Sequence, residues 1–183
     1  MNQRAFLFRF TVPAVLVALS AAAAGQSPAS SSAGAQSPSL TAETRHLTLA
    51  TSTTPPTVTA AKQRVVLNVD VALKPKMHVY APDQPKDQDY MPIVLAVAPD
   101  GAYQLLEKPR YPPSEKLFFA PLKETQHVYS KSFRVAQPIV VTADVGREPL
   151  TITGTVRYQA CDDAICYVPQ NIPISWEVKV NSK

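Results

Sequence analysis

Glycine is scarce in this 183-residue chain, which has only five glycines but 18 prolines. An average protein contains roughly 7% glycine and 5% proline. The glycines are scattered rather than clustered, so the chain cannot form the glycine-rich loop that cradles phosphate in nucleotide-binding proteins. Proline interrupts a helix at a cost of about 3 kcal/mol at an interior position, and the proline-free windows are rich in residues that favour strands. We therefore expect an all-β protein that binds no nucleotide.

The chain also lacks a strong excess of one charge. It has 18 Lys and Arg against 14 Asp and Glu, and two of the arginines, Arg4 and Arg9, lie in an N-terminal segment that we expect to be removed. The remaining net charge is +2, and the basic residues form no continuous run. Nucleic-acid-binding proteins concentrate basic residues in a patch or stripe. The sequence therefore predicts no nucleic-acid partner.

Long hydrophobic runs are absent except at residues 10–24, which follow two arginines and end in small residues before Gly25. This pattern is typical of an export signal. A membrane anchor is the alternative, but Pro13 and Ser20 interrupt a run that barely reaches the ~20 residues needed to cross a bilayer. We expect residues 1–24 to be a cleaved signal peptide, so that the mature chain has no membrane span and is periplasmic or secreted.

The rest of the chain divides into a tether and one domain. Residues 25–43 are mostly Ser, Ala, Pro and Gln, a composition that cannot bury enough apolar surface to offset the entropy of ordering. We expect a disordered tether there and a folded domain at 44–183. Apolar residues alternate with polar ones in the segments 46–49, 64–73, 93–97, 150–160 and 172–180. Further strands are expected at 128–135 and 139–143, and a Thr/Pro loop at 51–57. Such strands predict an antiparallel β-sandwich.

A proline-rich stretch, residues 107–126, surrounds the apolar pair Phe118 and Phe119. A loop of this length in a compact domain is often a lid or a binding element. The two rings could equally fill the core beneath the loop, and the residues alone favour this second interpretation.

Cysteine is nearly absent, and the two that occur, Cys161 and Cys166, are close in sequence. In an oxidising compartment such a pair should be disulfide-bonded at least part of the time. If the strand alternation continues, Cys161 falls on the outward face with Thr155, Arg157 and Gln159. A disulfide that closes so short a loop stabilises a fold by only about 2 kcal/mol, so it would contribute little to the stability of a domain of this size. At a hairpin tip it would present both sulfurs to a partner, although a purely structural hairpin disulfide remains an alternative.

The residues around the pair predict its redox character. Asp162 and Asp163 follow Cys161 directly, and carboxylates disfavour a nearby thiolate. We therefore expect a mild or reducing couple. A soft copper site would require the two cysteines to converge with residues from elsewhere in the chain. The candidates are His46, His78, His127, Met77 and Met91. Because they are scattered, we expect no metal site and no cofactor.

Two segments resemble a known family. Residues 158–169, with Tyr-Gln-Ala before Cys161 and Cys-Tyr-Val-Pro from Cys166, resemble the cysteine motif of the N-terminal (alpha) domain of DsbD-type thiol:disulfide interchange proteins. Residues 75–80, Pro-Lys-Met-His-Val-Tyr, resemble the turn and aromatic segment that precedes the active site in that domain. The resemblance extends over roughly residues 44–183, and the cysteine motif is its most specific part.

The resemblance implies an immunoglobulin-like fold with both cysteines in an exposed hairpin. The resemblance also implies that Cys166 forms the mixed disulfide with partners and that Cys161 resolves it. An aromatic cap loop shields the pair in the family, which reverses the interpretation of the two phenylalanines as core residues. The cap and site-lining positions implied here are Phe118, Phe119, Tyr80 and Tyr167.

The implied activity is that of a thiol-disulfide oxidoreductase-like electron shuttle between a thioredoxin-like module and periplasmic thiol-disulfide proteins. The chain contains no membrane-embedded electron importer and no Cys-x-x-Cys domain. We therefore expect thioredoxin-like periplasmic partners and a membrane electron donor that acts in trans. The alternative function is a non-catalytic immunoglobulin-like binding module whose short disulfide only pins a hairpin.

Overall fold

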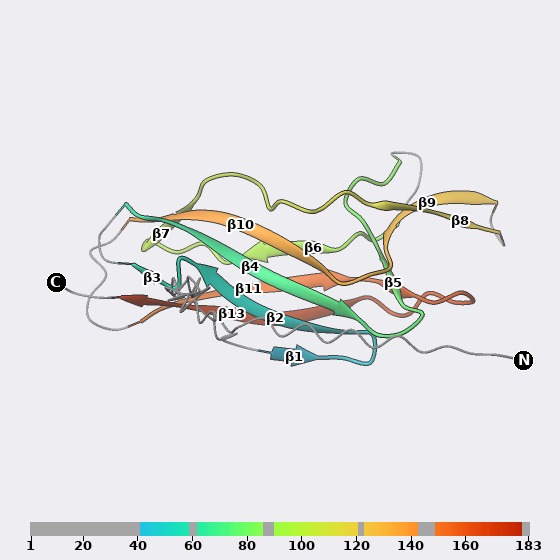
Figure 1. Ribbon diagram of the computed structural model, residues 1–183, viewed down its shortest axis with the longest axis horizontal. Helices are drawn as coiled ribbons and strands as arrows, with labels where there is room; N and C mark the ends of the chain where they lie inside the picture. Colours follow the sequence, from blue (N-terminus) through green and yellow to red (C-terminus); the bar gives the residue numbers. More distant parts are fainter. Residues whose placement is uncertain (1–40, 59–61, 86–89, 121–122, 143–148, 181–183) are drawn as a thin grey trace, which may run out of the picture. The chain divides into compact units, whose positions relative to one another are not determined.

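The computed structural model describes residues 41–58, 62–85, 90–120, 123–142 and 149–180, which belong to one structural unit. Regular structure in these segments consists of strands (Figure 1). None of the described segments forms a helix long and apolar enough to cross a bilayer. The expected signal peptide and most of the expected tether lie outside the described residues.

Two sheets make up the body of the domain. The first has the strand order β1-β2-β4-β10-β7 and is antiparallel throughout. Its strands are β1 (Thr41–Glu43), β2 (Leu47–Thr54), β4 (Arg64–Leu73), β10 (Phe133–Val141) and β7 (Tyr103–Leu105). The second has the order β3-β13-β11-β6, in which only the β3–β13 pair is parallel. Its strands are β3 (Thr57–Val58), β13 (Gln170–Val180), β11 (Leu150–Tyr158) and β6 (Val94–Val97).

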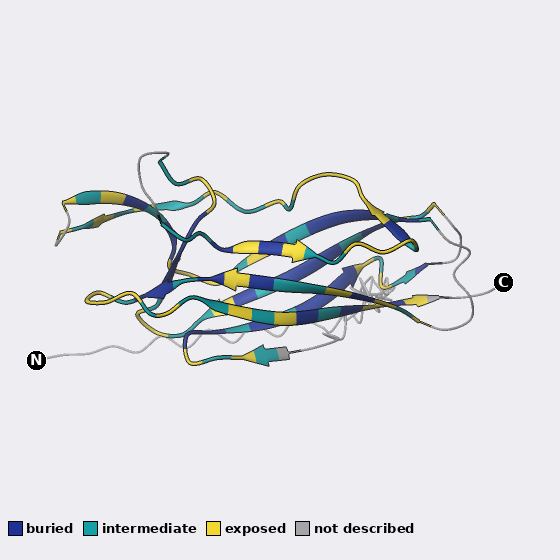
Figure 2. Cartoon of the chain, turned by 180° about the vertical axis from the view of Figure 1, so that it is seen from behind, coloured by how far each residue is buried: buried dark blue, intermediate teal, exposed yellow. Residues whose placement is uncertain are grey.

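The core lies between these sheets and is built by the period-two alternation of their strands. Val65, Leu67, Val69 and Val71 of β4 are buried, as are alternate apolar residues of β11 and β13 (dark blue in Figure 2). Trp176 is fully buried, and its indole N–H donates to the Asn68 carbonyl across the two sheets, at 2.9 Å. The expected fold, an all-β immunoglobulin-like antiparallel β-sandwich, is confirmed.

A third, smaller sheet carries the features that matter for function. Its strand order is β12-β5-β9-β8, and all pairs are antiparallel. The strands are β12 (Ala160–Cys161), β5 (His78–Tyr80), β9 (Glu124–Tyr129) and β8 (Glu115–Phe119). In Figure 1 the β8–β9 hairpin and the loop that follows β11 project at the same end of the domain.

Several expected boundaries were wrong. Strand pairing begins at Thr41, inside the expected tether. The expected loop at 51–57 is largely β2, in which Thr51, Ser52 and Thr53 are buried. The strand expected at 128–135 and the strand expected at 139–143 are instead the end of β9 and a single long β10. The chain leaves the third sheet after Tyr129 and enters the first at Phe133, and a change of sheet leaves no trace in hydrophobic alternation.

Candidate functional site

Cys161 and Cys166 are joined by a disulfide, with their Cα atoms 4.0 Å apart. The two sulfur-bearing residues have different environments, since Cys161 is only 2% exposed whereas Cys166 is exposed. The expectation that Cys161 lies on the outward face was therefore wrong. β11 ends at Tyr158, and the chain restarts as β12 in the third sheet, where Cys161 packs against Tyr80 and Val128. Only one end of the disulfide is open to a partner.

The short loop between the cysteines is organised by one carboxylate. Asp162 accepts the backbone N–H groups of Ala164 and Ile165 at 2.8 and 2.9 Å, and its other oxygen accepts the Tyr167 hydroxyl at 2.7 Å. The Tyr167 hydrogen bond, followed by the backbone N–H groups, lowers the pKa of Asp162 to about 2. Asp162 therefore stays ionised at neutral pH and fixes the loop in a turn that presents Cys166.

Tyr80 lies directly against the disulfide. Its hydroxyl is 3.3 Å from Cys166 Sγ and 3.5 Å from Cys161 Sγ. A disulfide sulfur carries no hydrogen, so the phenol is the donor. Burial, and then the proximity of Tyr90 and Glu124, raises the pKa of Tyr80 to about 12. The hydroxyl is therefore protonated at physiological pH and can donate to whichever sulfur gains negative charge.

Tyr90 lies behind Tyr80 and holds its ring in place, a contact that was not expected from the sequence. The Tyr90 ring stacks on the Tyr80 ring at a centroid distance of 4.4 Å. The Tyr90 hydroxyl donates to the Glu124 carboxylate and accepts the Gln126 amide at 3.0 Å. Tyr90 lies in an irregular polar segment, where no periodicity identifies a packed side chain. Together these contacts restrict the Tyr80 ring to the position beside the sulfurs.

The aromatic pair lies in a strand, not in a long loop as expected. Phe118 is 63% exposed and Phe119 is half-buried, so neither ring fills the core. Residues 117–120 line one side of a pocket of about 200 Å³. Its other side is formed by His78, Asp162 and Asp163. The β8 hairpin and the cysteine loop thus face one another across a shared pocket.

His78 is buried and is the cross-strand neighbour of Cys161. Burial lowers the pKa of His78, and the charges of Asp163 and Asp162 oppose this shift. The remaining histidines lie elsewhere, with His46 against the Tyr167 ring and His127 beside Asp83. Among the described residues, no group of three or more His, Cys, Asp or Glu side chains could hold a metal ion.

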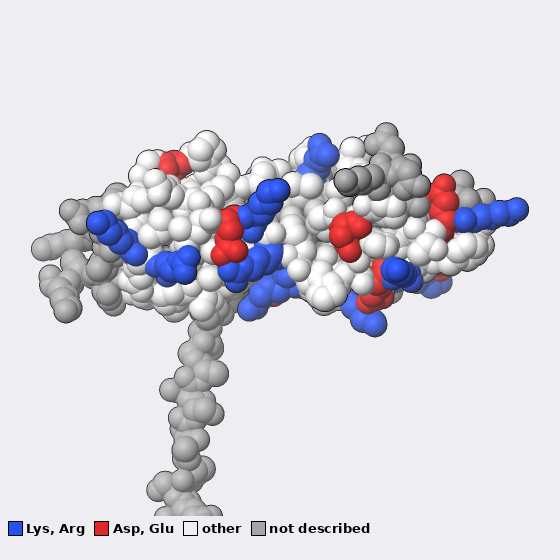
Figure 3. Space-filling view, turned by 90° about the horizontal axis from the view of Figure 1, so that it is seen from above, with Lys and Arg blue, Asp and Glu red and all other residues white. Residues whose placement is uncertain are grey.

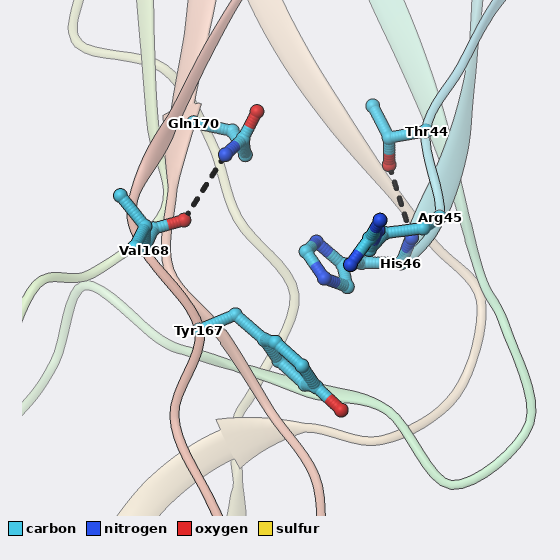
Figure 4. Close-up of a pocket in the computed structure, with 6 residues that line it drawn as sticks. All are labelled: Thr44, Arg45, His46, Tyr167, Val168 and Gln170. Atoms are coloured by element: carbon cyan, nitrogen blue, oxygen red, sulfur yellow. Dashed lines mark hydrogen bonds between the residues drawn. The ribbon is translucent and has the colours of Figure 1, made fainter.

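Of the residues expected at the site, Cys161, Cys166 and Tyr80 are brought into contact by the fold. Tyr167 follows Cys166, but its ring turns toward His46 rather than toward the sulfurs. A second pocket, of about 440 Å³, lies on that side (Figure 4). Charged side chains of both signs are interspersed on the face drawn in Figure 3. The arrangement offers one exposed sulfur, one buried sulfur and a neutral hydrogen-bond donor between them, which is suited to the opening and closing of a disulfide.

The chain is similar to known proteins at the level of one family and of solved structures. A family model described as thiol:disulfide interchange protein DsbD, N-terminal, matches residues 46–175. The N-terminal periplasmic domain of ScsB from Proteus mirabilis is 12% identical with a TM-score of 0.49, and the match covers 72% of this chain and 46% of that one. The chain thus spans less than half of that structure. The reduced DsbD N-terminal domain of Neisseria meningitidis is 22% identical with a TM-score of 0.41, covering 66% and 80%. A search of curated proteins found no match.

Proposed function

Since the chain belongs to the family of N-terminal domains of thiol:disulfide interchange proteins of the DsbD type, we propose that it is an exported electron shuttle. It relays reducing equivalents through Cys161 and Cys166 to or from periplasmic partners. The observation that carries the proposal is the asymmetry of the disulfide, in which Cys166 is exposed and Cys161 is buried. A structural disulfide has no need of an exposed sulfur beside a preformed hydrogen-bond donor.

The exchange proceeds in two displacements. A thiolate of the partner attacks Cys166 Sγ, the bond to Cys161 Sγ breaks, and Cys161 leaves as a thiolate that takes up a proton. The second thiol of the partner then attacks the mixed disulfide and releases Cys166, so the partner is oxidised and the pair holds two electrons. In the opposite half-reaction, the Cys166 thiolate attacks a disulfide of the acceptor and Cys161 resolves the intermediate.

Tyr80 stabilises the sulfur that leaves. Because its hydroxyl lies within 3.5 Å of both sulfurs, it can donate to the Cys161 thiolate that leaves in the first displacement and to the Cys166 thiolate that leaves in the second. A hydrogen bond to a charged group is worth about 1.5–3 kcal/mol. Phe118 and Phe119 lie across the pocket from the cysteine loop and are the proposed cap, which restricts approach to Cys166 from the β8 side without burying it, and Tyr167 lines the site through its bond to Asp162.

The partners we propose are thioredoxin-like periplasmic proteins together with a membrane electron donor that acts in trans. Export by a cleaved signal peptide at residues 1–24 would place the domain in an oxidising compartment, where the disulfide is expected to form. We propose a tether before the domain that is shorter than the expected residues 25–43, because β1 begins at Thr41.

The decisive experiment is trapping of the mixed disulfide. A Cys161→Ser variant keeps the exposed nucleophile but cannot resolve the intermediate, so it should accumulate covalent adducts with thioredoxin-like proteins. The matched Cys166→Ser variant retains only the buried thiol and should accumulate none. Absence of adducts, together with a disulfide that resists reduction below about −300 mV, would instead identify a binding module. In that case the double Ser variant should lose about 2 kcal/mol of stability and keep its partner.

A further inference from the structure

A second pocket begins at Tyr167, the residue that follows Cys166. It has a volume of about 440 Å³ and is formed by two segments that are far apart in the sequence (Figure 4). One is the turn between β1 and β2, and the other is the segment that leads from Cys166 into β13. The lining residues are Thr44, Arg45, His46, Tyr167, Val168 and Gln170.

His46 is the first sign that this pocket receives a ligand. The residue is 4% exposed, and neither of its ring nitrogens has a hydrogen-bond partner. The ring rests on the Tyr167 ring at a centroid distance of 4.5 Å and meets Tyr158 edge-on at 6.3 Å. Buried polar atoms are nearly always hydrogen-bonded, because an unsatisfied donor or acceptor loses its hydration without compensation. His46 thus lines the pocket with two ring nitrogens that are buried and have no hydrogen-bond partner.

Arg45 is the second sign, because it gives the pocket a positive charge without an internal counterion. Its side chain is exposed, and no described carboxylate forms an ion pair with it. The lining contains no Asp or Glu. An arginine beside a neutral imidazole donor suits a carboxylate, because a guanidinium can bind both oxygens of that group.

The pocket is also preformed. Thr44 Oγ1 donates to the Leu47 carbonyl and accepts the backbone N–H groups of His46 and Leu47, at 3.0–3.2 Å. The Tyr158 hydroxyl adds a further bond to the same oxygen, at 2.9 Å. These bonds fix the turn that carries Arg45 and His46, so little conformational entropy is lost when a ligand binds.

We propose that this pocket is a carboxylate subsite through which the domain selects exchange partners with an acidic side chain near their reactive cysteine. The inference rests on the function proposed above, since it assigns a specificity element to the same exchange site. Tyr167 is the residue after Cys166, and consecutive Cα atoms are about 3.8 Å apart. The pocket therefore begins at the residue next to Cys166, and we infer that side chains flanking the reactive cysteine of a partner can reach it. The carboxylate is not altered, while the Cys161–Cys166 bond breaks and Cys161 leaves as the thiolate.

The test uses pairs of short peptide thiols that differ only in a Glu or a Gln. In each peptide the Glu or Gln is separated from the cysteine by zero to three glycines and is placed either before or after it. This series varies the distance between the carboxylate and the thiol, since each residue spans about 3.3–3.6 Å. Stopped-flow measurement of mixed-disulfide formation with the oxidised full chain should show the Glu peptide reacting about fivefold faster at its best spacing. The advantage should shrink as NaCl screens the charge.

Variants then locate the effect. In Arg45→Gln the Glu and Gln peptides should react at equal rates. The matched control is Arg64→Gln. Arg64 is exposed and begins β4, whereas the end of β4 pairs with the start of β2 beside Arg45, so the Glu advantage should persist in this variant. Equal rates for Glu and Gln peptides at every spacing in the wild-type protein would overturn the inference, as would a Glu advantage that survives in Arg45→Gln.

A binding measurement separates a partner's side chain from a free small molecule. The α-amide of N-acetylglutamate, whose only carboxylate is in the side chain, should shift the His46 ring signals in ¹⁵N-histidine spectra, with saturation, and the α-amide of N-acetylglutamine, which has no carboxylate, should not. Saturable binding without a rate advantage for any Glu peptide would mean a site for free carboxylates and would overturn partner selection. Failure of every peptide to form a mixed disulfide would contradict the proposed exchange function instead.

Discussion

The hydroxyl of Tyr80 lies 3.3 Å from Sγ of Cys166, close enough to donate a hydrogen bond to the exposed sulfur of the disulfide. The same hydroxyl is 3.5 Å from Sγ of Cys161. One donor therefore serves both sulfurs, and its ring is held by Tyr90, which Glu124 and Gln126 hold in turn. This relationship makes the chemistry of the pair depend on a residue about eighty positions away in the sequence.

Replacement of Tyr80 by Phe should slow exchange without disrupting the fold, because only the hydroxyl is removed. Loss of a hydrogen bond to the leaving thiolate costs at least about 1.4 kcal/mol, which corresponds to a rate reduced about tenfold. The second-order rate constant for reaction with a small thiol measures this effect. The control is Tyr103→Phe, whose hydroxyl bonds the Ala98 carbonyl in another sheet. Equal rates in the two variants would rule out the proposed role of Tyr80.

Truncation of Phe118 should open the site. The ring is 63% exposed, so Phe118→Ala should change the free energy of unfolding by less than about 0.5 kcal/mol. Small thiol reagents should nevertheless react several-fold faster with the disulfide, because the Phe118 ring no longer restricts approach to Cys166 from the β8 side. Leu105→Ala, at a residue that is 49% exposed in β7, is the matched control and should leave the rate unchanged. An unaltered rate in Phe118→Ala would show that the ring does not shield the pair.

Acid should loosen the cysteine loop through Asp162. The pKa of this carboxyl is about 2 in the folded protein, owing first to the Tyr167 hydrogen bond, and it is about 3.9 in an unfolded chain. A lowered pKa stabilises the fold fully above about pH 4, and this contribution is lost as the pH falls toward 2. Denaturant titrations between pH 5 and 2 should therefore show a steeper loss of stability for the wild type than for Asp162→Asn. Asp163→Asn, at an exposed neighbouring position, should behave like the wild type.

Gly154 should tolerate no side chain. A Cβ at this position would lie 2.7 Å from the Ala96 carbonyl oxygen and 3.0 Å from the Trp176 ring. Because a strand backbone cannot move aside cheaply, Gly154→Ala should destabilise the sandwich by about 1–3 kcal/mol in urea unfolding. Gly101→Ala is the control, since a Cβ there meets nothing within 4 Å. Similar midpoints for the two variants would contradict the close approach of β6 and the Trp176 ring to Gly154.

The body of the sandwich could be predicted from the sequence, because each of its strands buries one face. β4 begins and ends where the alternation predicted, and Trp176 is buried on the predicted side of β13. The third sheet could not be predicted from the sequence. β12 contains only two residues, and it is defined by pairing with β5 some eighty residues earlier, so no local sequence pattern indicates it. The wrong face assigned to Cys161 has this origin.

The candidate site could be predicted from the sequence only in part, for a related reason. The cysteines and Tyr80 could be named from a resemblance, whereas Tyr90 and Glu124 depend on side-chain packing between distant segments. Asp162 was noted for its charge, and its place at the start of a turn is a common one for aspartate. His46 was considered only as a metal ligand, because its neighbours in the pocket come from residues 167–170.

The burial of Cys161 beside an exposed Cys166 has a kinetic consequence. In an electron relay of the kind proposed above, a single accessible sulfur would oblige the protein that loads electrons and the protein that removes them to use the same entrance, so the two could not be present together. Turnover would then be strictly alternating, of the ping-pong type, with each partner acting as a competitive inhibitor of the other. Flux through the domain would pass through a maximum as the concentration of either partner rises, so the ratio of donor to acceptor would set the rate of relay.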